Sequence, residues 1–192
     1  GEVVVDFGCG AGIDVILAAH KVGPTGKVVG VDMTPHMVER AKQSVVEANV
    51  TETTEILLAD LERVELPDGF TDVVISNCVI NLCPDKESIY REAFRILNPG
   101  GRLAISDIAY TGEIDPQVRE RFQASWAGCV GGAIAEDRYF QILRDVGFGQ
   151  VEIVARHPLQ PKELEEMARC PGPEFTPAPA KDDIASVGGN VV

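Results

Sequence analysis

The sequence predicts an α/β fold with a doubly wound, mostly parallel sheet flanked by helices, and three observations carry that prediction. Apolar strand segments alternate with helical segments through five strands, a pattern typical of parallel sheets with right-handed crossovers. The first strand, which begins at Val3, leads into a turn with glycine at alternate positions: Gly8, Gly10 and Gly12. Acidic residues end the first three strands, so we expect their side chains to meet at one edge of the sheet.

The glycine turn is typical of the start of a nucleotide-binding β–α–β unit. A helix is predicted from Ile13 to His20, directly after the turn. The second strand, Lys27 to Val31, ends at Asp32, twenty residues beyond Gly12. An acid at that distance can reach the hydroxyls of a bound ribose.

The details of the turn favour one nucleoside cofactor over another. Gly12 comes one residue earlier than the third glycine of the dinucleotide fingerprint, and Ile13 occupies the usual place. Asp6 and Asp14 flank the turn, and no Lys or Arg occurs between Gly1 and His20. Two carboxylates would repel a pyrophosphate but suit a ligand with a sulfonium and an ammonium. The sequence therefore predicts S-adenosylmethionine; the alternative, a glycine turn without a ligand, does not account for Asp32.

Caps and turns bound the remaining elements of the sheet. Thr34 is the expected N-cap, and Pro35 the first residue, of a helix that ends near Asn49. We expect its inner face to consist of Met37, Val38, Ala41, Val45 and Val46. The elements expected after it are a strand (Glu55 to Ala59), a turn (Pro67 to Gly69), a strand (Phe70 to Ser76), a helix (Asp85 to Leu97), a turn (Asn98 to Gly101) and a strand (Arg102 to Ile108).

Several residues at this edge are candidates for cofactor binding. Asp60 either accepts a hydrogen bond from an adenine amino group or caps a helix from Leu61 onward, and both interpretations stay open. Asn77, at the end of the fourth strand, is a more direct candidate than Cys78, which we expect to pack. The predicted cofactor-binding residues are Asp6, Gly8, Cys9, Gly10, Gly12, Asp32, Met33, Asp60, Leu61 and Asn77.

The pattern changes beyond the fifth strand. A lid-like insertion over about residues 112–134 contains a helical stretch, Pro116 to Ala127, and a glycine-rich stretch with Cys129. A helix from Ala135 to Val146 and a sixth strand from Gln150 to Arg156 follow. We expect residues 1–156 to form the main domain and residues 157–192 an extension with a proline-rich part. Both ends of the sequence look truncated, since the last residues resemble a strand just beginning.

Composition excludes several classes of protein. The 192 residues suit one α/β domain, and a net charge of −13 argues against a nucleic-acid partner. No apolar run is long enough to span a membrane, and no signal peptide is visible. The five cysteines are odd in number and lack a zinc-type C-x-x-C pair, which favours a reducing cytoplasm over a disulfide framework. We expect a monomer.

Two sets of residues resemble a known family. Asp6 to Gly12, Val31 to Met33 and Asn98 to Gly101 resemble the motifs of class I S-adenosylmethionine methyltransferases, whose fold is Rossmann-like. Ser76 to Leu82 and Trp126 to Ala133 narrow the resemblance to arsenite methyltransferases. The resemblance covers roughly Val3 to Arg156.

The resemblance implies methyl transfer to trivalent arsenic held by cysteine thiolates, through in-line attack of the arsenic lone pair on the sulfonium methyl. Cys129 would match a metalloid-binding cysteine, and Cys170 is the candidate for a second one. Thiolates are natural ligands for such a soft centre. The implied partners are arsenite or its thiol conjugates and a small thiol reductant.

Two other functions remain open. One is methyl transfer to a small organic acceptor, such as a quinone precursor or a lipid, with no dependence on Cys129. The other is a protein without catalytic activity that binds the cofactor or a metalloid. The two differ in turnover, because the second would bind without transferring a methyl group.

Overall fold

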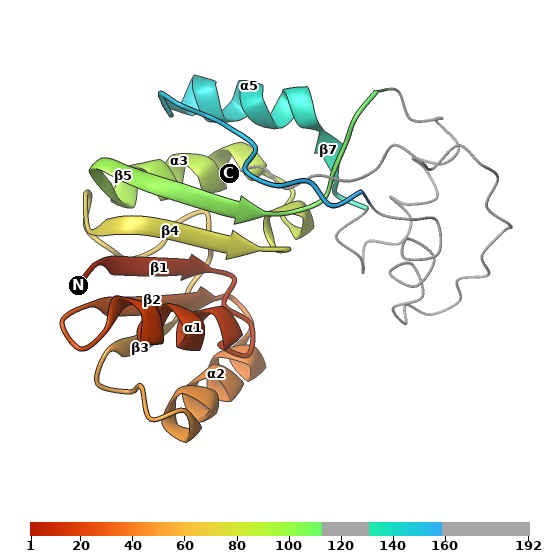
Figure 1. Cartoon of the computed structure of the whole chain (residues 1–192). Coiled ribbons are helices and arrows are strands. Elements are labelled where there is room, and N and C mark those ends of the chain that lie inside the picture. Colours follow the sequence, from red (N-terminus) through yellow and green to blue (C-terminus); the bar gives the residue numbers. More distant parts are fainter. Residues whose placement is uncertain (113–130, 159–192) are drawn as a thin grey trace, which may run out of the picture. The chain divides into compact units, whose positions relative to one another are not determined.

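A computed structural model describes residues 1–112 and 131–158. The chain forms two compact units. Unit 1 consists of Gly1–Asn77 and Glu87–Ile105, and unit 2 of Cys78–Lys86 with the chain from Ser106 onward. Figure 1 labels most of the elements of both units. Three predicted features lie outside the described residues: the helix from Pro116 to Ala127, the cysteines 129 and 170, and the proline-rich extension.

Unit 1 is built on a five-stranded sheet in the order β3-β2-β1-β4-β5. The strands are β1 (Val3–Phe7), β2 (Lys27–Asp32), β3 (Thr54–Leu58), β4 (Thr71–Asn77) and β5 (Leu97–Ser106). β1 pairs in parallel with both β2 and β4, and β2 pairs in parallel with β3. The chain thus winds outward from β1 in one direction and later in the other. This confirms the predicted doubly wound sheet and places a topological switch point between β1 and β4, where such sheets bind ligands.

Three helices accompany the sheet: α1 (Ile13–Val22), α2 (Pro35–Glu47) and α3 (Lys86–Ile96). The buried residues of α2 are Val38, Ala41 and Val45, which recur with helical spacing. Met37 and Val46 were predicted on the same face, but their side chains are 40% and 61% exposed. That part of the prediction is wrong because both residues flank the narrow buried stripe rather than lie on it.

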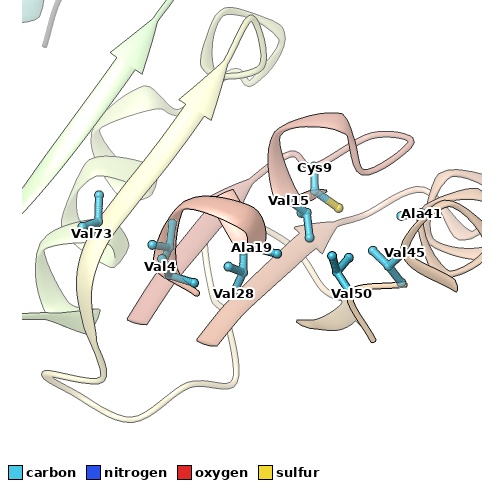
Figure 2. Close-up of a cluster of buried hydrophobic side chains, with 10 residues drawn as sticks. Val4, Cys9, Val15, Ala19, Val28, Ala41, Val45, Val50 and Val73 are labelled. Carbon is cyan, nitrogen blue, oxygen red and sulfur yellow. The ribbon is translucent and has the colours of Figure 1, made fainter. Parts of the chain in front are cut away.

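The core of unit 1 reaches up to the glycine turn. Figure 2 shows the Cys9 side chain beside Val15, within a cluster of buried valines and alanines. Gly30 on β2 makes this packing possible, because a Cβ there would lie 2.8 Å from Cγ2 of Val15 and 3.0 Å from Sγ of Cys9. Gly12 has a similar role, since its Cβ would lie 3.3 Å from Cα of Ala41. Small residues therefore bring the turn and two helices close to the sheet.

Unit 2 contains short elements. These are the 3₁₀ helix η1 (Ile80–Leu82), the strands β6 (Ala109–Tyr110) and β7 (Ile134–Ala135), and the helix α5 (Glu136–Val146). β6 and β7 pair in parallel, Ala109 with Ile134 and Tyr110 with Ala135. The sequence predicted α5 to within one residue at its start, but it did not predict this second sheet.

Two strand predictions need correction. β5 begins at Leu97 instead of Arg102, and the predicted turn residues lie inside it, with Gly100 at φ +84°. Residues 150–156 were predicted as a sixth strand but have no regular structure. Their alternating pattern is that of a strand, yet a strand also needs a neighbour for its backbone hydrogen bonds. Residues 150–156 have no such strand neighbour among the described residues, and the side chain of Arg156 donates from Nη2 to Oε1 of Glu136, at 2.8 Å.

No helix within residues 1–112 and 131–158 is long and apolar enough to cross a membrane.

Candidate functional site at the carboxyl edge of the sheet

The glycine turn uses most of its own backbone donors. The N–H groups of Gly8 and Cys9 both donate to the carbonyl oxygen of Val31, at 2.8 and 2.9 Å, and that of Gly12 donates to Cys9 at 2.8 Å. All three glycines of the turn have positive φ angles, between +51° and +89°, which side chains rarely adopt. These donors are therefore not available to a pyrophosphate, in agreement with the predicted preference for a cation.

Asp32 ties the glycine turn to the start of α2. Its Oδ2 accepts a hydrogen bond from the N–H of Gly10 at 2.9 Å, and its Oδ1 accepts one from the N–H of Thr34 at 2.8 Å. Each carboxylate oxygen keeps a second lone pair, which can accept a ribose hydroxyl. Thr34 is the N-cap residue as predicted, but its side chain makes no capping bond. The carboxylate of Asp32 supplies a bond at this helix start instead.

Asp6 is the buried charge at the centre of this edge. Its side chain is 1% exposed, and its Oδ2 has no hydrogen-bond partner among the described residues. Burial, together with the nearby charges of Asp14 and Asp32, raises the pKa of Asp6 to about 7. An orphaned buried carboxylate oxygen is rare in proteins and points to a ligand that supplies a donor or a positive charge.

Asp14 and Asn77 face each other across the switch point. The amide Nδ2 of Asn77, at the end of β4, donates to Oδ2 of Asp14 in the first turn of α1, at 3.2 Å. Asn77 is exposed at this edge. The bond holds the end of β4 beside the glycine turn, so Asn77 lies where the sequence predicted a contact with the cofactor.

The residues after β3 form the other end of the site. The N–H of Ala59 donates to the carbonyl oxygen of Asp32 at 3.1 Å, which brings Asp60 next to the end of β2. Oδ1 of Asp60 accepts from the N–H of Glu62 at 3.0 Å. Asp60 therefore caps a turn, not the helix that the sequence predicted as one alternative, and its Oδ2 atom accepts no hydrogen bond from the described residues. Leu61 is buried, whereas the side chain of Met33 is 64% exposed.

Of the three cysteines predicted at the site, the structure describes only Cys9. Cys9 is buried in the core, and burial raises the pKa of its thiol to about 12, so this residue acts as a small apolar side chain. Cys129 and Cys170, the predicted arsenic ligands, lie outside the described residues. Within the part of the chain that is described, no group of three His, Cys, Asp or Glu side chains could hold a metal ion.

Sequence reasoning missed the contacts that hold the site together. It named Asp14, Asn77 and Thr34 separately, but not the bonds that join them to each other or to Asp32. It also missed Gly30. A glycine inside an otherwise β-branched strand was the available signal, because such a residue often marks a close approach.

Known proteins resemble this chain in both sequence and structure. The model of a family described as a methyltransferase domain matches residues 1–147. An arsenite methyltransferase from Halobacterium salinarum is 43% identical over 156 residues, which cover 81% of this chain and 39% of the relative. Human arsenite methyltransferase is 33% identical over 175 residues, covering 85% of this chain and 46% of the relative. The chain thus spans less than half the length of these two relatives.

Among solved structures, an arsenic(III) S-adenosylmethionine methyltransferase from Chlamydomonas reinhardtii is similar with a TM-score of 0.79. Its sequence is 29% identical, and the match covers 99% of this chain and 62% of that one. The predicted Rossmann-like class I fold and the resemblance to arsenite methyltransferases are both confirmed.

Proposed function

This chain belongs to the methyltransferase-domain family, and on that premise we propose that it transfers a methyl group from S-adenosylmethionine to trivalent arsenic. The single observation that carries the choice of acceptor is the 43% identity to an arsenite methyltransferase over 156 residues. The geometry of the sheet edge supports the choice of cofactor.

The residues at the edge fit this cofactor. Asp6, Asp14 and Asp32 form an anionic cluster, and the Oδ2 atom of Asp6 lacks a partner among the described residues. A sulfonium and an α-ammonium are attracted to such a cluster, whereas a phosphate is repelled. Asp32 would hold the ribose, Asp60 and Leu61 the adenine, and Asn77 and the glycine turn the methionine part.

When bound, S-adenosylmethionine supplies a methyl cation equivalent: the arsenic lone pair forms the new As–C bond, the electrons of the S–C bond pass to sulfur, and arsenic(III) becomes arsenic(V). The protein's part is to hold donor and acceptor in line, which alone gives large effective molarities. A small thiol reductant is then needed to return arsenic to the trivalent state.

Cys129 and Cys170 are the proposed arsenic ligands in this chain. Thiolate sulfur binds soft, thiophilic centres far better than oxygen does. Arsenic bound in this way keeps its lone pair, so the reaction needs no general base. We expect the protein to act in the reducing cytoplasm, where these thiols stay free.

The test is methyl transfer from labelled S-adenosylmethionine to arsenite, with excess thiol, using the full-length protein. Cys129→Ser and Cys170→Ser should each lower arsenite binding and turnover at least tenfold. Cys83→Ser is the matched control, because the Cys83 thiol contacts the carbonyl oxygen of Val79, at 3.6 Å, and a hydroxyl can keep that contact.

The outcomes separate the competing functions. If Cys129→Ser methylates arsenite like the parent, the arsenic proposal fails and a small organic acceptor takes its place. If only Cys170→Ser is without effect, the second ligand lies elsewhere in the longer protein. Binding of cofactor and arsenite without any turnover would indicate a protein that is not an enzyme.

A further inference from the structure

We propose that Asn81 is a positioning residue that fixes both ends of the insertion between β6 and β7, the insertion that carries Cys129. The proposal concerns unit 2 and rests on the proposed function only for its kinetic readout. The described residues on either side of the insertion, 108–110 and 131–139, provide the observations.

The side-chain amide of Asn81 makes hydrogen bonds to two different segments of unit 2. The side chain is 1% exposed. Its Nδ2 donates to the carbonyl oxygen of Ile108 at 2.6 Å, and its Oδ1 accepts a hydrogen bond from the hydroxyl of Tyr139. Ile108 directly precedes β6, and Tyr139 lies in the first turn of α5, after β7. One amide group therefore links the segment before the insertion to the segment after it.

Gly132 makes a third contact, through backbone alone. A Cβ built on Gly132 would lie 1.7 Å from the carbonyl oxygen of Asn81 and 2.8 Å from its carbonyl carbon. Any other residue would force the two backbones apart. Gly132 belongs to the glycine-rich stretch and lies two residues before the start of β7, so the close approach fixes where the insertion rejoins the two-stranded sheet of β6 and β7.

The backbone of Asn81 is itself fixed. Its N–H donates to Oδ2 of Asp107 at 3.0 Å, while Oδ1 of the same carboxylate accepts from the N–H of Ile108 at 2.9 Å. Asp107 and Asn81 are both buried. A buried network in which each of these groups is paired is rigid, because loosening any member leaves another without a partner.

The two ends of the insertion are adjacent because β6 and β7 pair in parallel. Asn81 spans this pair from the side through Ile108, Gly132 and Tyr139. The two stretches that carry the resemblance to arsenite methyltransferases, Ser76 to Leu82 and Trp126 to Ala133, are thereby joined at Asn81 and Gly132. Their spacing along the sequence gives no sign of this contact.

The experiment compares Gly132→Ala with Gly149→Ala in the full-length protein. Gly149 is the matched control, because a Cβ there meets no atom within 4 Å. Gly132→Ala should raise KM for arsenite at least tenfold while KM for S-adenosylmethionine changes less than twofold. Tyr139→Phe, which removes one hydroxyl and keeps the ring, should change the arsenite KM in the same direction by about threefold. Gly149→Ala should match the parent in both constants.

Hydrogen exchange provides a readout that does not depend on the acceptor. In Gly132→Ala the amides of residues 108–110 and 134–135 should exchange faster, while those of β1 and β2 should not change. If the parent does not methylate arsenite, the proposed function fails, and the exchange data still decide the proposal about Asn81.

Two results would overturn the proposal. One is parent-like arsenite kinetics in Gly132→Ala or, if that variant does not fold, in Tyr139→Phe. The other is an equal rise of both KM values, which would mean that the network supports the whole fold rather than the acceptor side.

Discussion

Asp6 in unit 1 and Asp107 in unit 2 are both buried carboxylates at the end of a strand: Asp6 lies in β1, and Asp107 directly follows β5. Their surroundings differ. The carboxylate of Asp107 accepts two backbone hydrogen bonds, which offset part of the effect of burial, and its pKa rises to about 6. Oδ2 of Asp6 has no partner among the described residues, its carboxylate neighbours repel it, and its pKa rises to about 7. Asp107 joins Asn81 to Ile108 through its two hydrogen bonds, whereas for Asp6 we propose that a ligand supplies the missing partner.

The comparison gives a general way to interpret buried polar groups in this protein. A buried charge without a partner costs stability, of the order of 1–3 kcal/mol, unless something else supplies the missing bond. A network such as that of Asn81 already has its bonds. Changes in the network should therefore reduce stability first, and changes around Asp6 should affect cofactor affinity first.

The largest expected effect is on stability. Asn81→Ala removes two buried hydrogen bonds, to the carbonyl oxygen of Ile108 and to the hydroxyl of Tyr139, and leaves a small cavity, so it should lower the free energy of unfolding by about 2–4 kcal/mol. Denaturant titration measures this loss. Asn98→Ala is the control, because Asn98 makes a side-chain bond to Oδ1 of Asp72, at 3.0 Å, in a half-buried place, and should lose only about 1 kcal/mol. Equal losses would contradict the comparison.

Asp32→Ala should have its main effect on the cofactor. It removes a charged acceptor for the ribose and also frees the N–H groups of Gly10 and Thr34. Calorimetry should show affinity for S-adenosylmethionine weaker by about 1.5–3 kcal/mol. An unchanged affinity would reject the assignment of Asp32 to the ribose.

Asp6 should make cofactor binding depend on pH. A cationic ligand favours the carboxylate, so below a pKa of about 7 binding must release the proton of Asp6. The dissociation constant should then rise by about tenfold, or 1.4 kcal/mol, for each pH unit below 7. Asp6→Asn should bind more weakly near pH 7.5 but lose this dependence. Calorimetry at pH 5.5 to 7.5 measures the dissociation constant for S-adenosylmethionine. A constant that does not change with pH in the parent would refute the role of Asp6.

Stability should show the opposite dependence. The pKa of Asp6 is higher in the folded state than its ordinary value of 3.8, so protonated Asp6 favours folding. The contribution is complete below pH 4 and is lost as pH rises through 7. Thermal unfolding without cofactor should therefore show Asp6→Asn gaining stability over the parent as pH increases from 5 to 8.

The smallest effect is expected at an exposed ion pair. Arg102 donates to both oxygens of Glu2, at 2.7 and 3.0 Å, but the side chains are 62% and 49% exposed. Arg102→Ala should change the free energy of unfolding by less than about 1 kcal/mol and leave cofactor affinity unchanged. A loss comparable with that of Asn81→Ala would mean that burial does not govern these differences.

The sequence by itself was sufficient for the order of most elements of the sheet, whereas the cofactor-binding roles of the residues at its edge stay a prediction. The glycine turn, Asp32 and the alternating strands and helices depend on neighbours close in the chain, so local patterns reveal them. Residues 150–156 have the pattern of a strand but no partner strand among the described residues, and there the prediction was wrong. The predicted burial of Met37 and Val46 was also wrong, because a sequence pattern indicates the centre of a buried helix face better than its margins.

Only the tertiary structure decided which polar groups are paired. Oδ2 of Asp6 has no partner among the described residues, whereas the polar atoms of Asn81 reach Asp107, Ile108 and Tyr139, which lie 26 to 58 residues away in the sequence. The contact between Gly132 and the carbonyl oxygen of Asn81 is equally remote in sequence. Residue types state what each group can bind, but only the packing of distant segments determines whether the protein supplies the partner itself or leaves that place to a ligand.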